Sequence, residues 1–340
     1  MTAIQSALKK LVERQNLSQG EMESVFEEIL GGKAPASQVG ALLVALRLKG
    51  ETVEELAGAA SVLRAQAKKP KREFPDAVDT CGTGGDNSHT VNLSTAAALV
   101  AAGAQVRIAK HGNRAVSSRC GSADLFQSLG VNIESCLPEA AVESLQEIGI
   151  SFFFAPFWHP AMKAVALVRQ ELGVRTIFNL LGPLLNPVHV KLQVLGVFSP
   201  QWLQPMAQTL DRLGAERAIV VHGEDGVDEI TLTGQTKVFE LAQRKIHSYE
   251  ISPEQFGLKR CVSSDLKGGD AQENAERIIN ILKGEKGPLA DAITLNAAAA
   301  ILIGGKAKDW TEGIERAQDS IRSGSALKKL EALRKRFPVV

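Results

Sequence analysis

The sequence predicts an α/β protein in which a small helical N-terminal domain precedes a larger α/β domain whose sheet is flanked by helices. Three observations support this fold class. The first 70 or so residues carry a helical apolar period, residues 68–75 form a charged stretch with two prolines, and β-like runs then alternate with helical ones. The length of 340 residues, 44% of them hydrophobic, fits about two domains of roughly 150 residues each.

The N-terminal helices are marked by capping signals and by apolar spacing. Ser18 and Glu21 form a capping box before apolar residues at helical spacing, and Gly31 follows that stretch. The same spacing recurs over 39–46 before Gly50, and a second capping box at 52–55 opens a helix that runs to about residue 64. We therefore expect a helical domain over residues 1–70.

The second domain is expected over residues 76–340. Short β-like runs alternate here with helical stretches, and the segment from about 270 is again rich in helix signals. The expected strands are 77–81, 106–109, 150–154, 192–198 and 218–222, and the expected helices include 95–103, 122–130 and 200–213.

Charge and cysteine usage exclude several classes of protein. The 39 Lys and Arg residues nearly balance the 38 Asp and Glu residues, which favours neither nucleic acid nor a membrane as partner. No apolar run reaches the roughly 18 residues of a membrane span, and the first residues lack the apolar core of a secretory signal. The four cysteines form no C-x-x-C pair, so we expect a cytoplasmic protein with free thiols.

The densest motif is a glycine-rich turn directly after the first expected strand. Gly82, Gly84 and Gly85 can adopt backbone conformations that bring successive N–H groups toward an anion, and a helix begins near Ser94. The motif is not a dinucleotide fingerprint, because Asn87 stands where the third glycine belongs, and it lacks the lysine of a Walker A loop. A purely structural glycine turn is an equally good explanation of this motif alone.

A polar cluster follows the second expected strand. Lys110, His111, Asn113 and Arg114 lie within five positions, and serines follow at 117, 118 and 122. Such donors suit phosphate or carboxylate recognition, and the C-terminal ends of sheet strands are where α/β proteins bind ligands. Taken singly, each of these side chains could also be a solvated surface group.

An acidic cluster, residues 224–229, follows the last expected strand. Its four carboxylates repel one another unless a cation is present, and Mg²⁺ needs only one or two of them beside phosphate oxygens and water. The alternative is a solvated acidic turn. We expect this cluster to face the cationic group around 110–114 across a single cleft.

Together these segments resemble the anthranilate phosphoribosyltransferase family. The resemblance rests on DTCGTGGD (79–86), NLST (92–95), KHGNRAVSS (110–118) with GSAD (121–124), the stretch from 159 to 187, and GEDGVDEI (223–230). It implies transfer of the 5-phosphoribosyl group from phosphoribosyl pyrophosphate to the amine of anthranilate, with release of pyrophosphate, in tryptophan biosynthesis. It also implies Mg²⁺ as cofactor, a homodimer, a central, mostly parallel sheet, and a helical domain completed by the segment of about 163–190.

The resemblance also implies site residues. Phosphoribosyl pyrophosphate would be bound by Gly82, Gly85, Asp86, Thr90, Asn92, Leu93, Ser94, Thr95, Lys110, His111, Gly112, Asn113, Arg114, Ala115, Val116, Ser117, Ser118 and Ser122. Anthranilate would be bound by Gly82, Asn113, Arg169, His111 and His159, and the metal by Ser94, Asp228 and Glu229. No general base is assigned, because the aromatic amine is neutral near pH 7.

Two rival functions belong to other classes. A pyrimidine nucleoside phosphorylase shares the architecture, but its glycine-and-serine signature is not found in this sequence. A non-catalytic relative that binds nucleic acid in the cleft is disfavoured by the net charge of +1 and by the intact pair Asp228 and Glu229.

Overall fold

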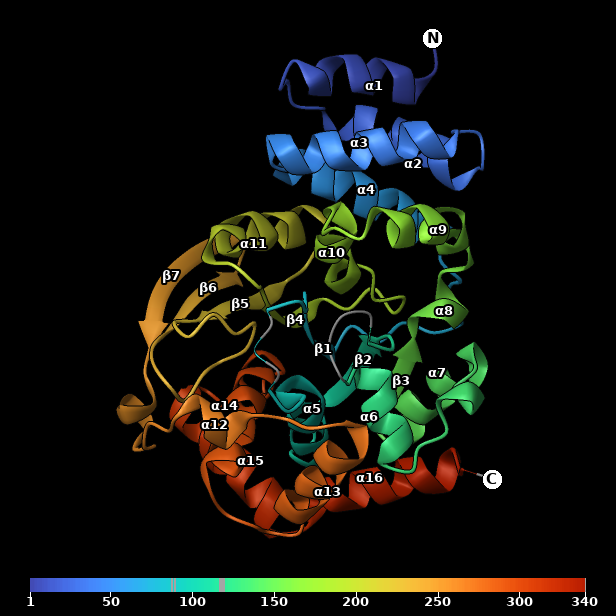
Figure 1. The fold of residues 1–340 in the computed structure, drawn as a ribbon. Coiled ribbons are helices and arrows are strands. Elements are labelled where there is room, and N and C mark those ends of the chain that lie inside the picture. Colours follow the sequence, from blue (N-terminus) through green and yellow to red (C-terminus); the bar gives the residue numbers. More distant parts are fainter. Residues whose placement is uncertain (87, 89, 116–119, 340) are drawn as a thin grey trace.

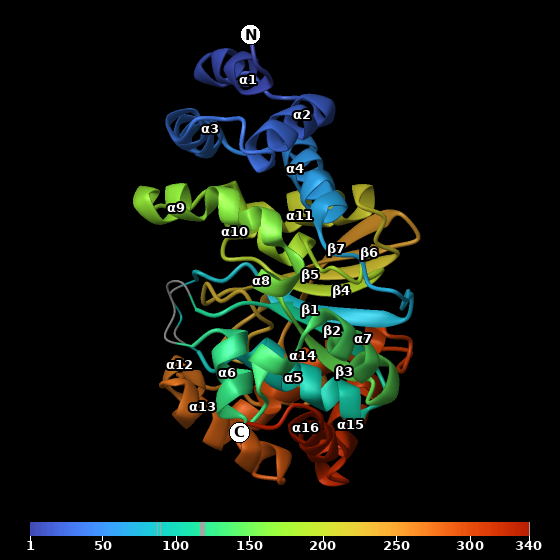
Figure 2. The ribbon, with the colours of Figure 1, turned by 90° about the vertical axis from the view of Figure 1, so that its right-hand side faces the viewer.

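The computed structural model describes residues 1–86, 88, 90–115 and 120–339. A seven-stranded sheet lies between two layers of helices (Figure 1). The helices of the N-terminal segment lie beyond one face of the sheet, and the C-terminal helices cover the other (Figure 2). This arrangement confirms the predicted fold class.

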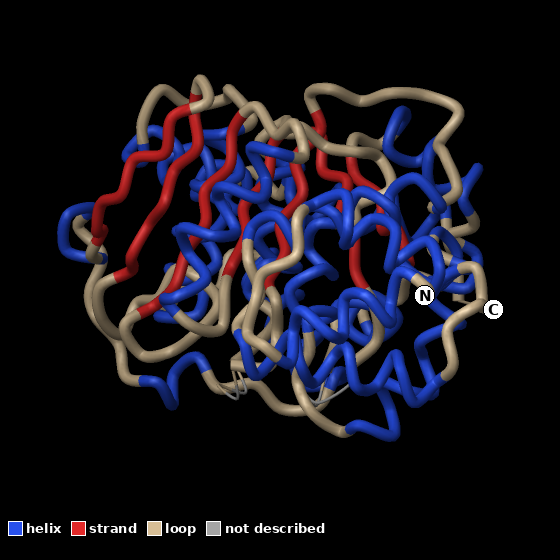
Figure 3. Tube along the Cα trace, turned by 90° about the horizontal axis from the view of Figure 1, so that it is seen from above, coloured by secondary structure: helices blue, strands red, loops and turns tan. Residues whose placement is uncertain are grey.

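The sheet is parallel over five strands and antiparallel at one edge. The strand order is β3-β2-β1-β4-β5-β6-β7, and only the pairs β5–β6 and β6–β7 are antiparallel. Seen from above, the strands lie side by side across the molecule (Figure 3). Their bounds are β1 Ala77–Gly82, β2 Arg107–Gly112, β3 Ile150–Phe154, β4 Leu192–Gly196, β5 Arg217–Gly223, β6 Thr236–Ala242 and β7 Lys245–Ile251.

Four N-terminal helices pack on a shared apolar core. They are α1 (Ala3–Val12), α2 (Gln19–Leu30), α3 (Ala36–Lys49) and α4 (Val53–Gln66). The capping boxes at Ser18 and Thr52 form as predicted, and Met22, Val25 and Phe26 are buried. The same core includes side chains of the later helices α9 (Lys163–Leu172), α10 (Ile177–Leu181) and α11 (Leu203–Arg212).

The opposite face of the sheet is covered by helices that are largely apolar. The central helices α5 (Leu93–Gly103) and α14 (Pro288–Ile303) are buried over most of their length, which explains their alanine-rich sequences. The surrounding helices are α6 Ser122–Ser128, α7 Pro138–Glu147, α12 Ser263–Leu266, α13 Ala271–Leu282, α15 Trp310–Arg322 and α16 Ser325–Arg336, while the short α8 Ala155–Trp158 follows β3.

The hairpin of β6 and β7 was not expected from the sequence. Its two-residue turn is Gln243–Arg244, and both residues have positive φ, 51° and 60°. Turns of this geometry usually carry Asn-Gly or Asp-Gly, so the sequence lacked the ordinary hairpin signal. In the described part of the chain, no helix is long and apolar enough to cross a membrane.

Candidate functional site

A cavity of about 590 Å³ lies at the C-terminal ends of the parallel strands. It is lined by the glycine turn after β1, the loop after β2, residues of α8 to α10, and the segment after β5. The chain runs from β1 through β2 to β3 on one side of β1 and then crosses back to β4 on its other side. This reversal of strand order opens a crevice at the strand ends, where α/β sheets bind ligands.

Most of the residues expected at the site line this one cavity. From the donor and metal sets these are Gly82, Gly85, Asp86, Thr90, Asn92, Ser94, Thr95, Lys110, His111, Gly112, Asn113, Arg114, Ala115, Ser122, Asp228 and Glu229, and from the acceptor set also His159 and Arg169. Leu93 is different, because its side chain belongs to the buried core beneath the sheet. The expected positions Val116, Ser117 and Ser118 lie outside the described residues.

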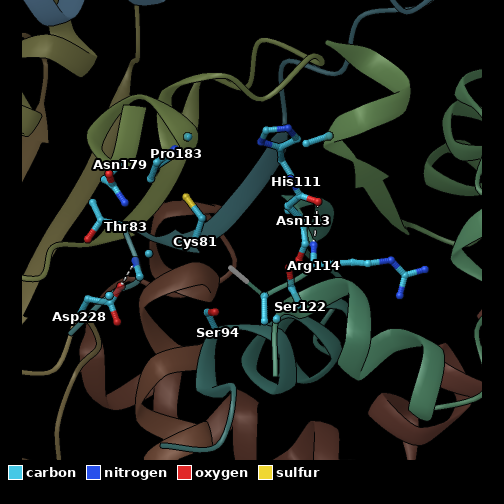
Figure 4. A pocket seen from close by; sticks show the side chains of 18 of the residues that line it. Cys81, Thr83, Ser94, His111, Asn113, Arg114, Ser122, Asn179, Pro183 and Asp228 are labelled. Atoms are coloured by element: carbon cyan, nitrogen blue, oxygen red, sulfur yellow. Dashed lines mark hydrogen bonds between the residues drawn. The ribbon is translucent and has the colours of Figure 1, made fainter. Parts of the chain in front are cut away.

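The glycine turn is held in shape by contacts with β4 and with Asp228. Gly84 and Gly85 have φ values of 66° and 75°, which glycine adopts without strain. The Gly84 N–H donates to Asp228 Oδ2 at 2.6 Å, and the Thr83 N–H donates to the Gly196 carbonyl at 2.9 Å. Figure 4 shows Asp228 directly beneath the turn, so the acidic segment and the glycine turn form one unit.

Lys110 provides a buried cation in the floor of the cavity. Its Nζ donates to the Thr80 carbonyl at 2.5 Å and lies 3.5 Å from Ser94 Oγ, at the start of α5. Burial lowers the pKa of Lys110, and the negative charge of Asp79 opposes that change. Burial also raises the pKa of Asp79 to about 6. A second anion, such as a phosphate, would favour the charged form of the lysine.

Three carboxylates meet beside the turn. Asp228 donates its N–H to Asp86 Oδ2 at 3.4 Å, and Glu229 Oε1 accepts the Ser94 N–H at 3.1 Å. Burial raises the pKa of Asp228, and the neighbouring Asp86 raises it further. Burial and the charge of Asp228 raise the pKa of Glu229. A cation between these groups would relieve the repulsion.

The other members of the acidic cluster do not face the cavity. Glu224 Oε2 accepts the Gln235 N–H at 3.0 Å, and Asp225 Oδ2 accepts the hydroxyls of Thr231 and Thr233 at 2.8 and 2.6 Å. The expectation that the whole cluster faces the cleft is therefore wrong for these two residues. Both carboxylates instead accept hydrogen bonds within residues 224–235.

The two cationic residues of the segment 110–114 also differ in whether their charged groups face the cavity. Arg114 lines the cavity, but Figure 4 shows its side chain extending away from the other labelled residues. The guanidinium donates to Asp124 at 3.3 Å and to Glu134 at 2.9 Å. Of Lys110 and Arg114, it is Lys110 whose charged group lies between β1 and the start of α5.

Two uncharged imidazoles lie at the other end of the cavity. The ring centroids of His111 and His159 are 5.3 Å apart in an edge-to-face arrangement, and both residues are buried. Burial lowers the pKa of His111 to about 3 and that of His159 to about 4. Both rings are therefore neutral at pH 7, and this part of the cavity suits an uncharged aromatic group.

Arg169 of α9 also lines the cavity. Its guanidinium carbon lies 4.9 Å from the centroid of the Phe178 ring, and burial lowers its pKa. The planar fork of an arginine can bind a carboxylate through two parallel hydrogen bonds. A negatively charged aromatic acid could thus place its ring near the histidines and its carboxylate at Arg169.

Several lining residues were not singled out from the sequence. Thr83 and Ser88 belong to the glycine turn and its continuation, and Asn179 and Pro183 belong to α10 and the segment after it. The places of Asn179 and Pro183 follow from the packing of α10 against the helical domain, which is a long-range contact without a local signal. The stretch from 159 to 187 was noted as a whole, but spacing could not show which of its side chains face inward.

The metal residues suit a cation shared with a substrate. Among the described residues, no group of three or more His, Cys, Asp or Glu side chains is arranged to enclose a metal ion. The adjacent Asp228 and Glu229 nevertheless present two carboxylates to the cavity, and Mg²⁺ is commonly held by one or two carboxylates with substrate phosphates and water. The donor set fits Mg²⁺ in that form.

Comparison with known proteins places the chain in a family. The helical bundle domain of the glycosyl transferase family matches residues 5–67, and the a/b domain of that family matches residues 74–327. The anthranilate phosphoribosyltransferase of Alkaliphilus metalliredigens is 50% identical over 330 residues, which are 97% of each chain. The chain belongs to the anthranilate phosphoribosyltransferase family.

Solved structures of family members agree with the fold of this chain. The anthranilate phosphoribosyltransferase from Thermus thermophilus superposes with a TM-score of 0.92 at 47% identity, covering 97% of this chain and 99% of that one. The enzyme from Saccharomyces cerevisiae, in complex with PRPP and Mg, gives a TM-score of 0.90 at 30% identity over 98% and 97% of the two chains. Both family members span nearly the full length of this chain.

Proposed function

We propose that this family member transfers the 5-phosphoribosyl group of phosphoribosyl pyrophosphate to the amine of anthranilate and releases pyrophosphate. One observation carries the proposal. A single cavity joins an anion-binding glycine turn and two buried carboxylates at one end to two neutral imidazoles and Arg169 at the other. The first end suits a highly charged donor, and the second suits a small aromatic acid as acceptor.

The donor would occupy the end of the cavity near β1. The backbone N–H groups of the turn and the positive end of α5 favour phosphate oxygens, and Lys110 adds a full charge. Thr90, Asn92, Ser94 and Thr95 line the same wall and can donate hydrogen bonds to phosphate or ribose oxygens. Burial strengthens each of these interactions because it excludes water.

Asp228 and Glu229, with Ser94, would hold Mg²⁺, which neutralises the leaving pyrophosphate when it is bound. The chain itself fixes the geometry of this pair. Asp228 is tied to the turn through Gly84, and Glu229 is tied to the start of α5 through the Ser94 N–H. The carboxylates therefore cannot move independently of the groups that bind the donor.

The acceptor would lie between the histidine pair and Arg169. Neutral His111 and His159 provide an uncharged wall for the ring, and Arg169 pairs with the carboxylate. The amine would then face the anomeric carbon of the donor. As the bond from that carbon to pyrophosphate breaks, the amine nitrogen forms the new bond and then releases one proton to solvent or to the leaving pyrophosphate. The residues therefore mainly position the two substrates and stabilise charge.

The activity is tested by mixing the protein with Mg²⁺, phosphoribosyl pyrophosphate and anthranilate and following the loss of anthranilate fluorescence. We expect turnover in the wild type, and a loss of roughly 10²–10³-fold in Asp228→Asn and Lys110→Met. Glu224→Gln is the matched control, because Glu224 lies in the same acidic run but is exposed and bonds to Gln235. Near wild-type turnover of Asp228→Asn at saturating Mg²⁺ would refute the metal assignment.

Two further assays, of thymidine cleavage and of DNA binding, separate the rival functions when they are run beside the anthranilate assay. Phosphate-dependent cleavage of thymidine without consumption of anthranilate would indicate a nucleoside phosphorylase. Salt-sensitive binding of DNA without Mg²⁺-dependent turnover would indicate the non-catalytic nucleic-acid-binding relative.

We also propose that the enzyme is a homodimer. Leu48 of α3 is 77% exposed and Leu167 of α9 is 64% exposed, and these two helices contact each other at the surface of the helical domain. Large exposed apolar side chains on neighbouring elements favour association. Light scattering on the purified protein should give the mass of two chains, and Leu48→Glu should reduce it to one.

We further propose that the enzyme works in the cytoplasm. Cys81, Cys136 and Cys261 are free thiols, and the reducing cytoplasm keeps thiols in that state. Fractionation of cells that produce the protein should recover it with cytoplasmic markers.

A further inference from the structure

Arg175 connects the helical side of the cavity to the glycine turn. It lies in the four residues between α9 and α10, and its Nη2 donates to the carbonyl of Gly85. Its guanidinium carbon also lies 4.7 Å from the centroid of the Phe198 ring, in the segment after β4. Among the described residues, those that line the cavity include Gly85 but not Arg175, so the arginine lies behind the turn.

The glycine turn is thus supported from three directions. Asp228 accepts the Gly84 N–H from the side of the acidic segment. The segment after β4 contributes a second support, because the Phe198 N–H donates to Thr83 Oγ1 at 3.0 Å. Arg175 is the third support, and it is the one that comes from the segment between Arg169 and Asn179.

The contact with Arg175 determines which way a peptide group points. The described chain contains no cis peptide bonds, and in a trans peptide the carbonyl and the following N–H point in opposite directions. Because the Gly85 carbonyl faces Arg175, the N–H of Asp86 faces away from it. A Cβ on Gly85 would lie 3.3 Å from Nε and Nη2 of Arg175, a tight contact, and the positive φ of 75° also favours glycine here.

We propose that Arg175 is a positioning residue for the sugar donor. It holds the Gly85–Asp86 peptide with its N–H turned toward the diphosphate, and it links this donor group to the segment that carries the acceptor residue Arg169. The inference rests on the proposed function for the identity of the donor, but the geometry it describes concerns any diphosphate bound at the turn.

The test measures binding directly as well as turnover. Calorimetry with Mg²⁺ gives the Kd of inorganic pyrophosphate and of phosphoribosyl pyrophosphate for the wild type, Arg175→Ala and Arg175→Lys. We expect the alanine substitution to weaken the binding of both compounds roughly tenfold, since a charged hydrogen bond is lost. The lysine variant should recover part of that affinity. The KM for the donor should rise with the Kd, while the KM for anthranilate changes less than about twofold.

A matched control removes a positive charge elsewhere. Arg322 is 79% exposed by its side chain and pairs only with nearby Asp319 in the described structure, so Arg322→Ala should bind the donor as the wild type does. Should Arg175→Ala fail to fold, Phe198→Leu provides a second variant. It removes the ring beneath the guanidinium but keeps the backbone N–H bond to Thr83, and we expect about threefold weaker binding.

The outcomes are distinct. Wild-type affinity of Arg175→Ala for both probes would overturn the proposal. If Arg175→Ala does not fold, wild-type affinity of both Arg175→Lys and Phe198→Leu would overturn it instead. If pyrophosphate affinity depends on Arg175 but the wild type does not consume anthranilate, the proposed function is refuted and the positioning role is left intact.

Discussion

The two imidazoles in the cavity are kept neutral mainly by burial. Burial is the largest cause of the low pKa of both His111 and His159, nearby positive groups lower it further, and the Leu185 backbone opposes the change at His159. In the unfolded chain each would titrate near 6.5. Neutrality at pH 7 is therefore linked to the folded state.

This linkage predicts a loss of stability in acid. The pKa of His159 falls from 6.5 to about 4 on folding, so the unfolded chain binds more protons between these pH values and stability decreases as the pH falls through them. In His159→Gln, the slope of unfolding free energy against pH in this window should be shallower by up to about 1.4 kcal/mol per pH unit. Urea titrations from pH 8 to 4 measure the slope.

The value at pH 8 serves as the internal control. There the histidine is neutral in both states, so any difference between variant and wild type reports lost packing alone. An unchanged slope below pH 6.5, whatever the offset at pH 8, would contradict the neutral state of His159 in the folded protein.

At the scale of the element, the N-terminal helices and the parallel strands carried clear local signals. Capping boxes and apolar spacing placed α2 and α4, and apolar runs placed the five parallel strands to within a few residues. The antiparallel β6 and β7 were missed because their turn lacks glycine or asparagine. Prediction thus succeeded for those elements whose position is marked by signals in their own local sequence.

The end of β4 shows how an element positions the site. A Cβ at Gly196 would lie 1.6 Å from the backbone oxygen of Asp228, so no side chain fits without moving that segment. We expect Gly196→Ala to displace Asp228 and reduce turnover by roughly 10² or more, as for loss of a preorganised group. It should also lower the melting temperature. Turnover assays and thermal melts measure the two effects.

Gly20 is the matched control for this substitution. It lies near the start of α2, a Cβ added there would meet no atom within 4 Å, and its φ is not positive. Gly20→Ala should leave turnover unchanged and stabilise the protein by about 0.5–1 kcal/mol. Equal turnover in the two variants would show that Asp228 does not depend on the close approach at Gly196.

At the scale of the whole molecule, a half-buried arginine joins the N-terminal helices to the segment beside the cavity. Arg64 of α4 donates to the carbonyls of Leu184 at 2.6 Å and Leu213 at 3.2 Å. Pro183 and Leu185, on either side of Leu184, line the cavity. We propose that residues 1–70, completed by about 163–190, form one domain and residues 76–340 the other. The bond from Arg64 to Leu184 then lies within the first domain, and the bond to Leu213 joins it to the second.

Loss of this contact should destabilise the protein far more than loss of a surface ion pair. Arg64→Met keeps much of the apolar volume but leaves two carbonyls without their charged donor, so we expect a loss of about 2 kcal/mol or more in urea unfolding. Arg212→Met is the control, because Arg212 joins α11 to Glu54 of α4 through an exposed pair and should cost less than about 1 kcal/mol. Equal losses would contradict a special role for Arg64.

The sequence alone determined the fold class and the chemistry-bearing segments, because helix caps, apolar periods and a glycine-rich turn are properties of neighbouring residues. Only the tertiary structure decided which side chains of each segment meet. It directed Asp228 and Glu229 into the cavity and Glu224 and Asp225 back onto their loop, and it brought Arg175 onto Gly85, 90 residues away along the chain. Such choices depend on long-range packing and burial, which local spacing does not encode.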